Sequence, residues 1–237
     1  QITAGLSAFG YGEHWRPMLE DIITGAVAPP EANDQQPAVI NVLSALSPSN
    51  RKKVCQRFFE AGVNFAYSEE LLSYLRDDQV REMFCRNAVG LDLESNGNAV
   101  FQIACHDGVR PLSTPLQPEG MTPDDFMAMC DGLAAQYPDR WIVGHNLLAW
   151  DLPVIQRLAP GTSWASQKTG IWDTQLISWY LEPWRRSHAL TGAAKAHDAA
   201  EDALAALKLF RQQAGSLPLD YRKLLGDRKW NMSTLWA

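Results

Sequence analysis

The hydrophobic residues between positions 38 and 87 recur at spacings of three and four. This period is that of amphipathic helices, and it predicts three of them, over 38–46, 47–62 and 67–87. We therefore expect residues 1–86 to form a mainly helical N-terminal module.

The period changes to that of a strand near residue 87. Residues 89–95 alternate between two faces of a predicted strand, which places Asp92 and Glu94 on the same face. Asn96–Gly97 favours a two-residue hairpin turn, and residues 99–105 then form the returning strand. A half-exposed strand with polar residues facing water would show the same alternation.

The rest of the chain, up to about residue 212, alternates between helical and strand-like segments. The expected elements are a helix over 121–137, a strand over 140–145, a helix over 148–159, a strand over 170–174, a helix over 174–183 and a long helix over 199–213. This order predicts an α/β layer fold with a mixed sheet. We expect one domain over 87–212 and a C-terminal extension or linker over 213–237.

The composition is that of an ordinary globular protein. Of the 237 residues, 46% are hydrophobic and 20% are charged, so a sizeable core is expected. The apolar runs are too short to span a bilayer, and the four cysteines show no paired spacing. We expect a cytoplasmic protein that does not bind membranes, with reduced cysteines that serve as packing residues.

Four acidic residues are predicted to converge: Asp92, Glu94, Asp151 and Asp202. Clustered carboxylates repel one another unless cations hold them together, and carboxylate oxygens suit hard divalent cations. Asp151 begins a predicted helix, where an acid is also favoured by the helix dipole alone. We interpret Asp151 as a ligand, and Asp173, at a similar strand-to-helix corner, as a helix cap.

The position of Asp202 in its helix separates it from its neighbour Glu201. At 100° per residue, Asp202 lies on the apolar side of the helix, whereas Glu201 belongs to its solvent side. Asp198 and Glu201 also form a capping-box pattern at the helix start. An inward carboxylate is costly without a cation, so Asp202 is the better candidate ligand.

His197 lies just before this helix and is the best candidate for a general base, since histidine takes up a proton near neutral pH. A solvated loop histidine is the alternative, and His145 and His188 are weaker candidates. The formal charge of −6 includes −5 from residues 87–212, which carry 9 basic and 14 acidic side chains. Bound divalent cations would reverse the sign of the local field at the acidic cluster.

Three segments resemble the motifs of the DnaQ-like DEDDh 3′→5′ exonucleases, a family with an RNase H-like fold. LDLESNG at 91–97 resembles the first motif, HNLLAWD at 145–151 the second, and His197 followed after four residues by Asp202 the third. The likeness covers about residues 88–212. Ser95 and Asn96 stand where two threonines are common in the family, and Trp150 stands where phenylalanine is common.

The resemblance implies a five-stranded sheet of order 3-2-1-4-5, whose third strand has no clear counterpart in the sequence. It also implies two Mg²⁺ or Mn²⁺ ions held by the four carboxylates, with His197 as the general base for the attacking water. The expected reaction releases nucleoside 5′-monophosphates from the 3′ end of single-stranded DNA or RNA, with DNA favoured. By the same resemblance, the terminal nucleotide is bound near Ser95, Asn96, Asn146 and Trp150.

Other functions stay open on the sequence alone. A non-catalytic nucleic-acid or protein-binding module of the same fold, or an endonuclease, would have a similar pattern. Trp179, Tyr180 and Trp184 beside Arg185 and Arg186 suggest stacking and phosphate binding, whereas a helix that buries its tryptophans and exposes its arginines is the alternative. We expect the N-terminal module to bind a protein partner or further domains of the same polypeptide.

Overall fold

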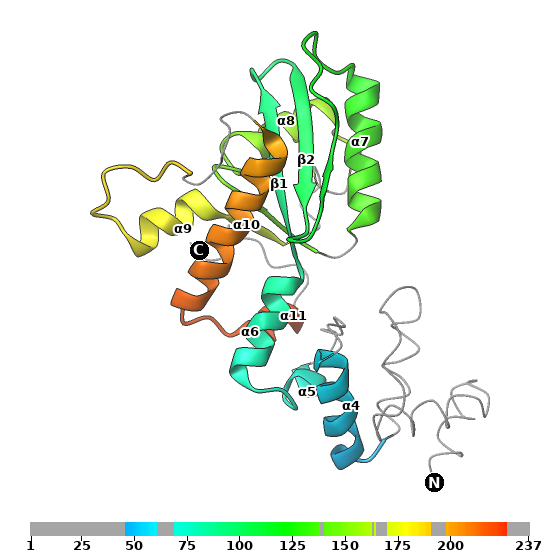
Figure 1. Ribbon diagram of the computed structural model, residues 1–237, viewed down its shortest axis with the longest axis vertical. Helices are drawn as coiled ribbons and strands as arrows, with labels where there is room; N and C mark the ends of the chain where they lie inside the picture. Colours follow the sequence, from blue (N-terminus) through cyan, green and yellow to red (C-terminus); the bar gives the residue numbers. More distant parts are fainter. Residues whose placement is uncertain are drawn as a thin grey trace, which may run out of the picture. The chain divides into compact units, whose positions relative to one another are not determined.

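The computed structural model describes residues 46–60, 69–137, 140–162, 164, 170–190 and 198–226. These residues divide into two compact units (Figure 1). The first unit contains the described residues up to Arg86 together with Asp220–Gly226, and the second contains those from Asn87 to Leu219.

The described residues of the first unit form helices that differ from the expected ones. They are α4 (Pro48–Glu60), α5 (Glu69–Leu72), α6 (Asp77–Arg86) and α11 (Tyr221–Gly226). The single helix predicted over 67–87 is wrong, because the chain turns between α5 and α6. The Gln79 side chain accepts a hydrogen bond from Arg76 N (3.0 Å) and so begins α6. Apart from Leu46, the helix predicted over 38–46 lies outside the described residues.

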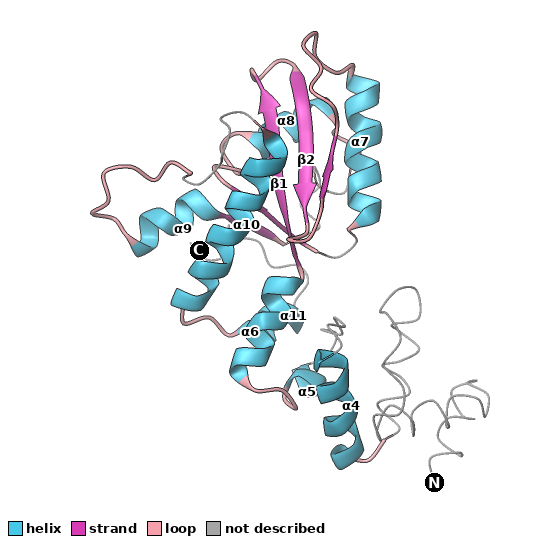
Figure 2. Ribbon diagram, in the orientation of Figure 1, coloured by secondary structure: helices cyan, strands magenta, loops and turns pink. Residues whose placement is uncertain are grey.

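The second unit contains a mixed five-stranded sheet of order β3-β2-β1-β4-β5, and this order confirms the predicted one (Figure 2). The strands are β1 (Ala88–Ser95), β2 (Val100–His106), β3 (Pro111–Ser113), β4 (Trp141–Gly144) and β5 (Ile171–Asp173). Strand β1 pairs antiparallel with β2 and parallel with β4. The third strand, which the sequence pattern did not locate, is the short edge segment β3.

The hairpin between β1 and β2 is longer than the predicted two-residue turn. The register of the two strands shifts between Glu94 and Ser95, and the connection runs over residues 96–99. The Asn96 side chain accepts hydrogen bonds from the N–H groups of Asn98 (3.0 Å) and Ala99 (2.9 Å). A tight turn of the expected type needs positive φ at two successive residues, and here only Gly97 (φ 86°) has it.

Helices cover both faces of the sheet. On one face, Val89, Leu91 and Leu93 belong to a core shared with α7 (Pro123–Gln136) and α8 (Asp151–Leu158). On the other face, α10 (Ala199–Ser216) packs against β1 and β2, and α9 (Thr174–Leu181) packs against α10 (Figure 1). The polar face of β1 therefore lies toward α10.

Side chains cap the starts of α7 and α10. Thr122 Oγ1 accepts a hydrogen bond from Asp125 N (3.2 Å) at the start of α7, and Asp198 caps α10. Helix α10 continues to Ser216, so the domain boundary expected at residue 212 falls inside it. The buried Gln213 side chain joins Trp172 Nε1 (3.0 Å) to the carbonyl of Thr174 (2.7 Å).

Two smaller findings complete the fold. The cysteines are free, and three of the four are buried, as expected of packing residues. Among the described ranges, no helix combines the length and the apolar character that a membrane crossing needs.

Candidate metal site

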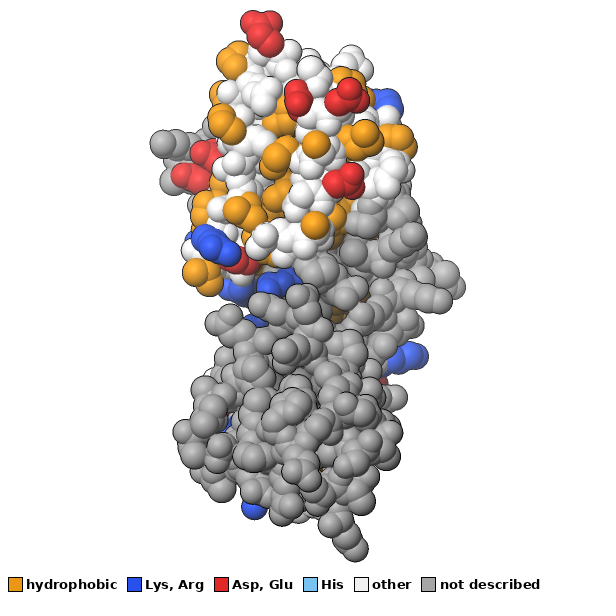
Figure 3. Space-filling view, turned by 90° about the vertical axis from the view of Figure 1, so that its right-hand side faces the viewer, with side chains coloured by type: hydrophobic (Ala, Val, Ile, Leu, Met, Phe, Trp, Pro, Cys, Tyr) orange, Lys and Arg blue, Asp and Glu red, His pale blue; other side chains and the backbone are white. Residues whose placement is uncertain are grey.

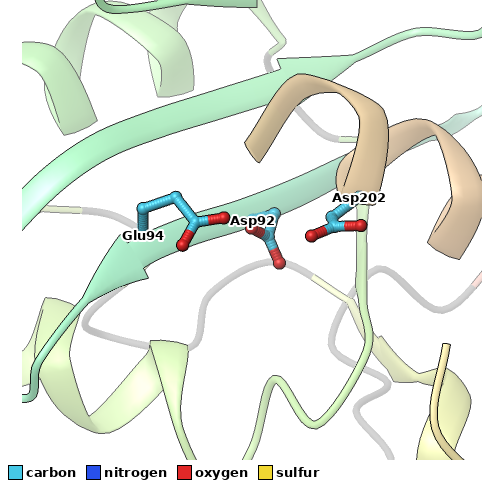
Figure 4. Close-up of side chains that lie close together, drawn as sticks. All are labelled: Asp92, Glu94 and Asp202. Carbon is cyan, nitrogen blue, oxygen red and sulfur yellow. The ribbon is translucent and has the colours of Figure 1, made fainter. Parts of the chain in front are cut away.

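Three carboxylates meet on the α10 side of the sheet. Asp92 and Glu94 extend from β1, Asp202 extends from the first turn of α10, and one oxygen of each lies within 4.8 Å of the others. Asp92 lies between the other two side chains (Figure 4). Glu201, the neighbour of Asp202, is not part of this group. An all-oxygen donor set of this kind fits a hard divalent cation such as Mg²⁺ or Mn²⁺.

A close contact between β1 and α10 sets this geometry. Gly90 lies two residues before Asp92 on the same face of β1, and a Cβ atom built on it would lie 2.1 Å from the carbonyl oxygen of Ala203. Only glycine allows α10 to approach the strand this closely. The residue next to Ala203 in the helix is Asp202, so the contact holds that carboxylate over β1. Sequence analysis missed Gly90, although a glycine in a strand is a recognised sign of close backbone approach.

Asp151 is the first residue of α8 and is buried, with an exposed fraction of 2%. It is not among the three carboxylates that lie within 4.8 Å of one another. Strand β1 pairs with β4 only over Ala88–Gly90, and beyond that pairing the Leu93 backbone N–H donates to Asp151. The fourth predicted ligand therefore lies beside the cluster, at the point where β1 and β4 separate.

Burial and mutual repulsion disfavour negative charge in this cluster. Burial is the main cause that raises the pKa of Asp92 to about 9. The neighbouring carboxylates of Asp151, Asp202 and Glu94 raise the pKa of Asp92 further, in that order. Burial likewise raises the pKa of Asp151 to about 8, against the opposing effect of the Leu93 N–H. A cation would relieve this repulsion and favour the ionised carboxylates.

Asp173 caps α9, as predicted, and has a second role that the sequence did not reveal. Its carboxylate accepts hydrogen bonds from Gln175 N (2.9 Å) and Leu176 N (3.3 Å) in the helix. It also accepts from Asn146 N (3.2 Å) and Leu148 N (2.9 Å). Asp173 thereby fixes the loop that leads from β4 to Asp151.

The predicted nucleotide-binding residues occupy different environments. Trp150 immediately precedes Asp151 and is 46% exposed, so its indole is accessible. Asn146 adopts a left-handed conformation (φ 62°) at the start of the same loop. The buried Ser95 Oγ has no hydrogen-bond partner in the described part of the chain. The Asn96 side chain, by contrast, is occupied by the hairpin turn.

The structure describes two of the three candidate histidines. His197, the predicted general base, lies outside the described residues. His145 Nδ1 lies 2.9 Å from Thr174 Oγ1, and burial lowers the pKa of this histidine, which favours the neutral ring. His188 Nδ1 lies 3.0 Å from Ser178 Oγ on α9.

Known proteins do not add to this description. No family model matches the chain, and no curated protein or solved structure is significantly similar to it.

Proposed function

We propose that residues 87–212 form a metal-dependent 3′→5′ exonuclease that hydrolyses single-stranded nucleic acid and releases nucleoside 5′-monophosphates. The observation that carries the proposal is the meeting of Asp92, Glu94 and Asp202, with Asp151 buried beside them. The strand order β3-β2-β1-β4-β5 is consistent with an RNase H-like fold and so supports the same assignment.

The four carboxylates would hold two divalent cations in this proposal. When bound, these cations would supply positive charge to the attacking and leaving oxygens of a phosphodiester. Asp92 lies between Glu94 and Asp202, so it is the carboxylate best placed to be shared. Asp151 would approach from the α8 side, where the Leu93 N–H orients its carboxylate.

His197 is proposed as the general base that removes a proton from the attacking water. The chain places it one residue before Asp198, whose side chain caps α10 and so fixes the start of the helix that carries Asp202. The exposed Trp150 ring, next to Asp151, would stack on the terminal base. Stacking of this kind favours unpaired ends, and we propose DNA as the preferred substrate over RNA.

The test is degradation of a 5′-labelled single-stranded DNA oligomer with Mg²⁺ or Mn²⁺, beside matched RNA, duplex DNA and an EDTA control. We expect a metal-dependent ladder that shortens from the 3′ end. Circular single-stranded DNA serves as the matched control, because it offers internal bonds without a 3′ end. It should resist the enzyme.

Two other outcomes would replace the proposal. Cleavage of the circle would identify an endonuclease. Bound Mn²⁺ without cleavage of any substrate would favour a binding module. The Asp92→Asn variant, purified in the same way, excludes a contaminating nuclease.

A further inference from the structure

The end of α9 and the residues after it expose an unusual concentration of aromatic side chains. The exposed fraction is 50% for Trp179, 58% for Tyr180 and 77% for Trp184, and Arg185 and Arg186 are exposed beside them. These five residues are called the α9 patch below. The alternative in which this helix buries its tryptophans is therefore wrong: α9 buries Thr174, Ile177 and Ser178 instead. In Figure 1 this segment projects from the side of the sheet domain.

The α9 patch is shaped by contacts within its own segment. The chain folds back so that His188 Nδ1 meets Ser178 Oγ (3.0 Å). The His188 ring also stands edge-on to Trp179, with 6.1 Å between centroids and 88° between planes. Three large aromatic residues on such a short segment are more than the scattered apolar residues of an ordinary surface. This surface is consistent with a ligand that has flat apolar groups.

The charge of the α9 patch points to a phosphate-bearing ligand. Residues 174–190 carry two arginines and one acid, Glu182, within a domain whose formal charge is −5. Arg185 pairs with Glu182 (3.2 Å), and both side chains are exposed, so the pair is weak and easily exchanged for a phosphate. By contrast, the face that carries α7 shows acidic side chains dispersed among apolar and neutral ones (Figure 3).

The α9 patch also has a defined relation to the candidate metal site. Helix α9 begins at Thr174, directly after Asp173, and Asp173 holds the loop that precedes Asp151. Eight helical residues extend about 12 Å, which about three or four stacked nucleotides span. The length of α9 is therefore one that a few nucleotides upstream of a 3′ end can cover.

We propose that the α9 patch binds single-stranded nucleic acid upstream of the 3′-terminal nucleotide, by stacking bases on its aromatic rings and pairing phosphates with its arginines. The proposal rests on the proposed exonuclease function for the direction of the strand. It adds a substrate-length preference: strands long enough to reach the α9 patch bind more tightly than a trinucleotide.

The test is fluorescence anisotropy of labelled dT12 and dT3 with the full chain. EDTA is present so that binding is measured without metal-dependent cleavage. We expect the double variant Trp179→Ala/Trp184→Ala to raise the Kd for dT12 at least about fivefold. Arg185→Ala/Arg186→Ala should weaken binding and lower the salt dependence of log Kd by about 1.4. The matched control is Val109→Ala/Arg110→Ala, which removes an exposed apolar and an exposed basic side chain elsewhere on the domain.

The outcomes separate this proposal from the proposed function. The α9 patch is not a nucleic-acid surface if the control and patch variants bind dT12 equally, or if the wild-type chain does not bind it. Either result would overturn this proposal even if the enzyme cleaves DNA. Patch-dependent dT12 binding without cleavage in Mn²⁺ would support it while removing the exonuclease. If the patch variants lose self-association in sedimentation but keep dT12 binding, the surface joins copies of the chain instead.

Discussion

Asp151 and Asp173 are both nearly fully buried at junctions between the sheet and its helices, yet their surroundings differ. Asp173 accepts hydrogen bonds from four backbone N–H groups. Asp151 lies near other carboxylates, and its pKa is raised to about 8, chiefly by burial. Four backbone donors make Asp173 structural, whereas Asp151, with the backbone donors of Leu93 and its own residue only, also faces further acids and is a candidate ligand.

The largest expected effect tests the ligand side of this comparison. Asp92→Asn keeps the shape of the side chain but removes its charge, so hydrolysis of single-stranded DNA should fall by roughly 10³-fold or more. Asp125→Asn, on the exposed start of α7, is the control and should leave the rate unchanged. His197→Ala should resemble Asp92→Asn. A rate within tenfold of wild type in Asp92→Asn would remove Asp92 from the site.

The structural side is tested by Asp173→Ala, which leaves four backbone donors without their acceptor. We expect the free energy of unfolding to fall by about 3 kcal/mol, measured by urea denaturation. Asp198→Ala removes an ordinary helix cap and should cost about 1 kcal/mol. Equal losses in the two variants would show that holding the loop before Asp151 contributes little.

Gly90→Ala tests the contact that brings α10, with Asp202, close to β1, with Asp92 and Glu94. The added Cβ would meet the Ala203 carbonyl, so we expect a loss of about 2 kcal/mol in stability and weaker Mn²⁺ binding by calorimetry. Gly132, in the middle of α7, has nothing within 4 Å of its Cβ position. Gly132→Ala should therefore stabilise by up to about 1 kcal/mol. Unchanged Mn²⁺ affinity in Gly90→Ala would argue against the contact as a determinant of the site.

The last prediction concerns the pH dependence of stability. The pKa of Asp92 is about 9 in the folded protein, above its ordinary value of 3.8, so between these values the folded state holds the extra proton. The stability that the neutral Asp92 carboxyl contributes to the metal-free protein is therefore complete below pH 3.8 and should be lost as the pH rises to about 9. In EDTA, the melting temperature of Asp92→Asn should decline less steeply than that of wild type, and Mn²⁺ should oppose the wild-type decline. Parallel curves for the two proteins would contradict the raised pKa.

The sequence predicted those parts of the molecule that depend on local period. Alternation along β1 placed Asp92 and Glu94 on one face, and the helical angle of Asp202 turned it toward the sheet. The strand order followed from the resemblance instead. Strand β3 could not be predicted, because three residues, two of them exposed, carry no periodic signal. The hydrogen bonds that Asp173 accepts from the loop before Asp151 could not be predicted either, because that loop is distant in sequence and no local pattern indicates such a contact.

The contact between Gly90 and Ala203 joins β1, the first strand of the second unit, to α10, the last helix of that unit within the described residues. A ribosome that has made β1 through α9 has not yet made Asp202, so the candidate metal site is incomplete throughout most of the synthesis of this domain. Pairing segments so far apart in the chain also carries a loop-closure cost that contacts between neighbouring elements do not. The order of synthesis thus delays this site: its carboxylates can come together only after most of the domain has been made.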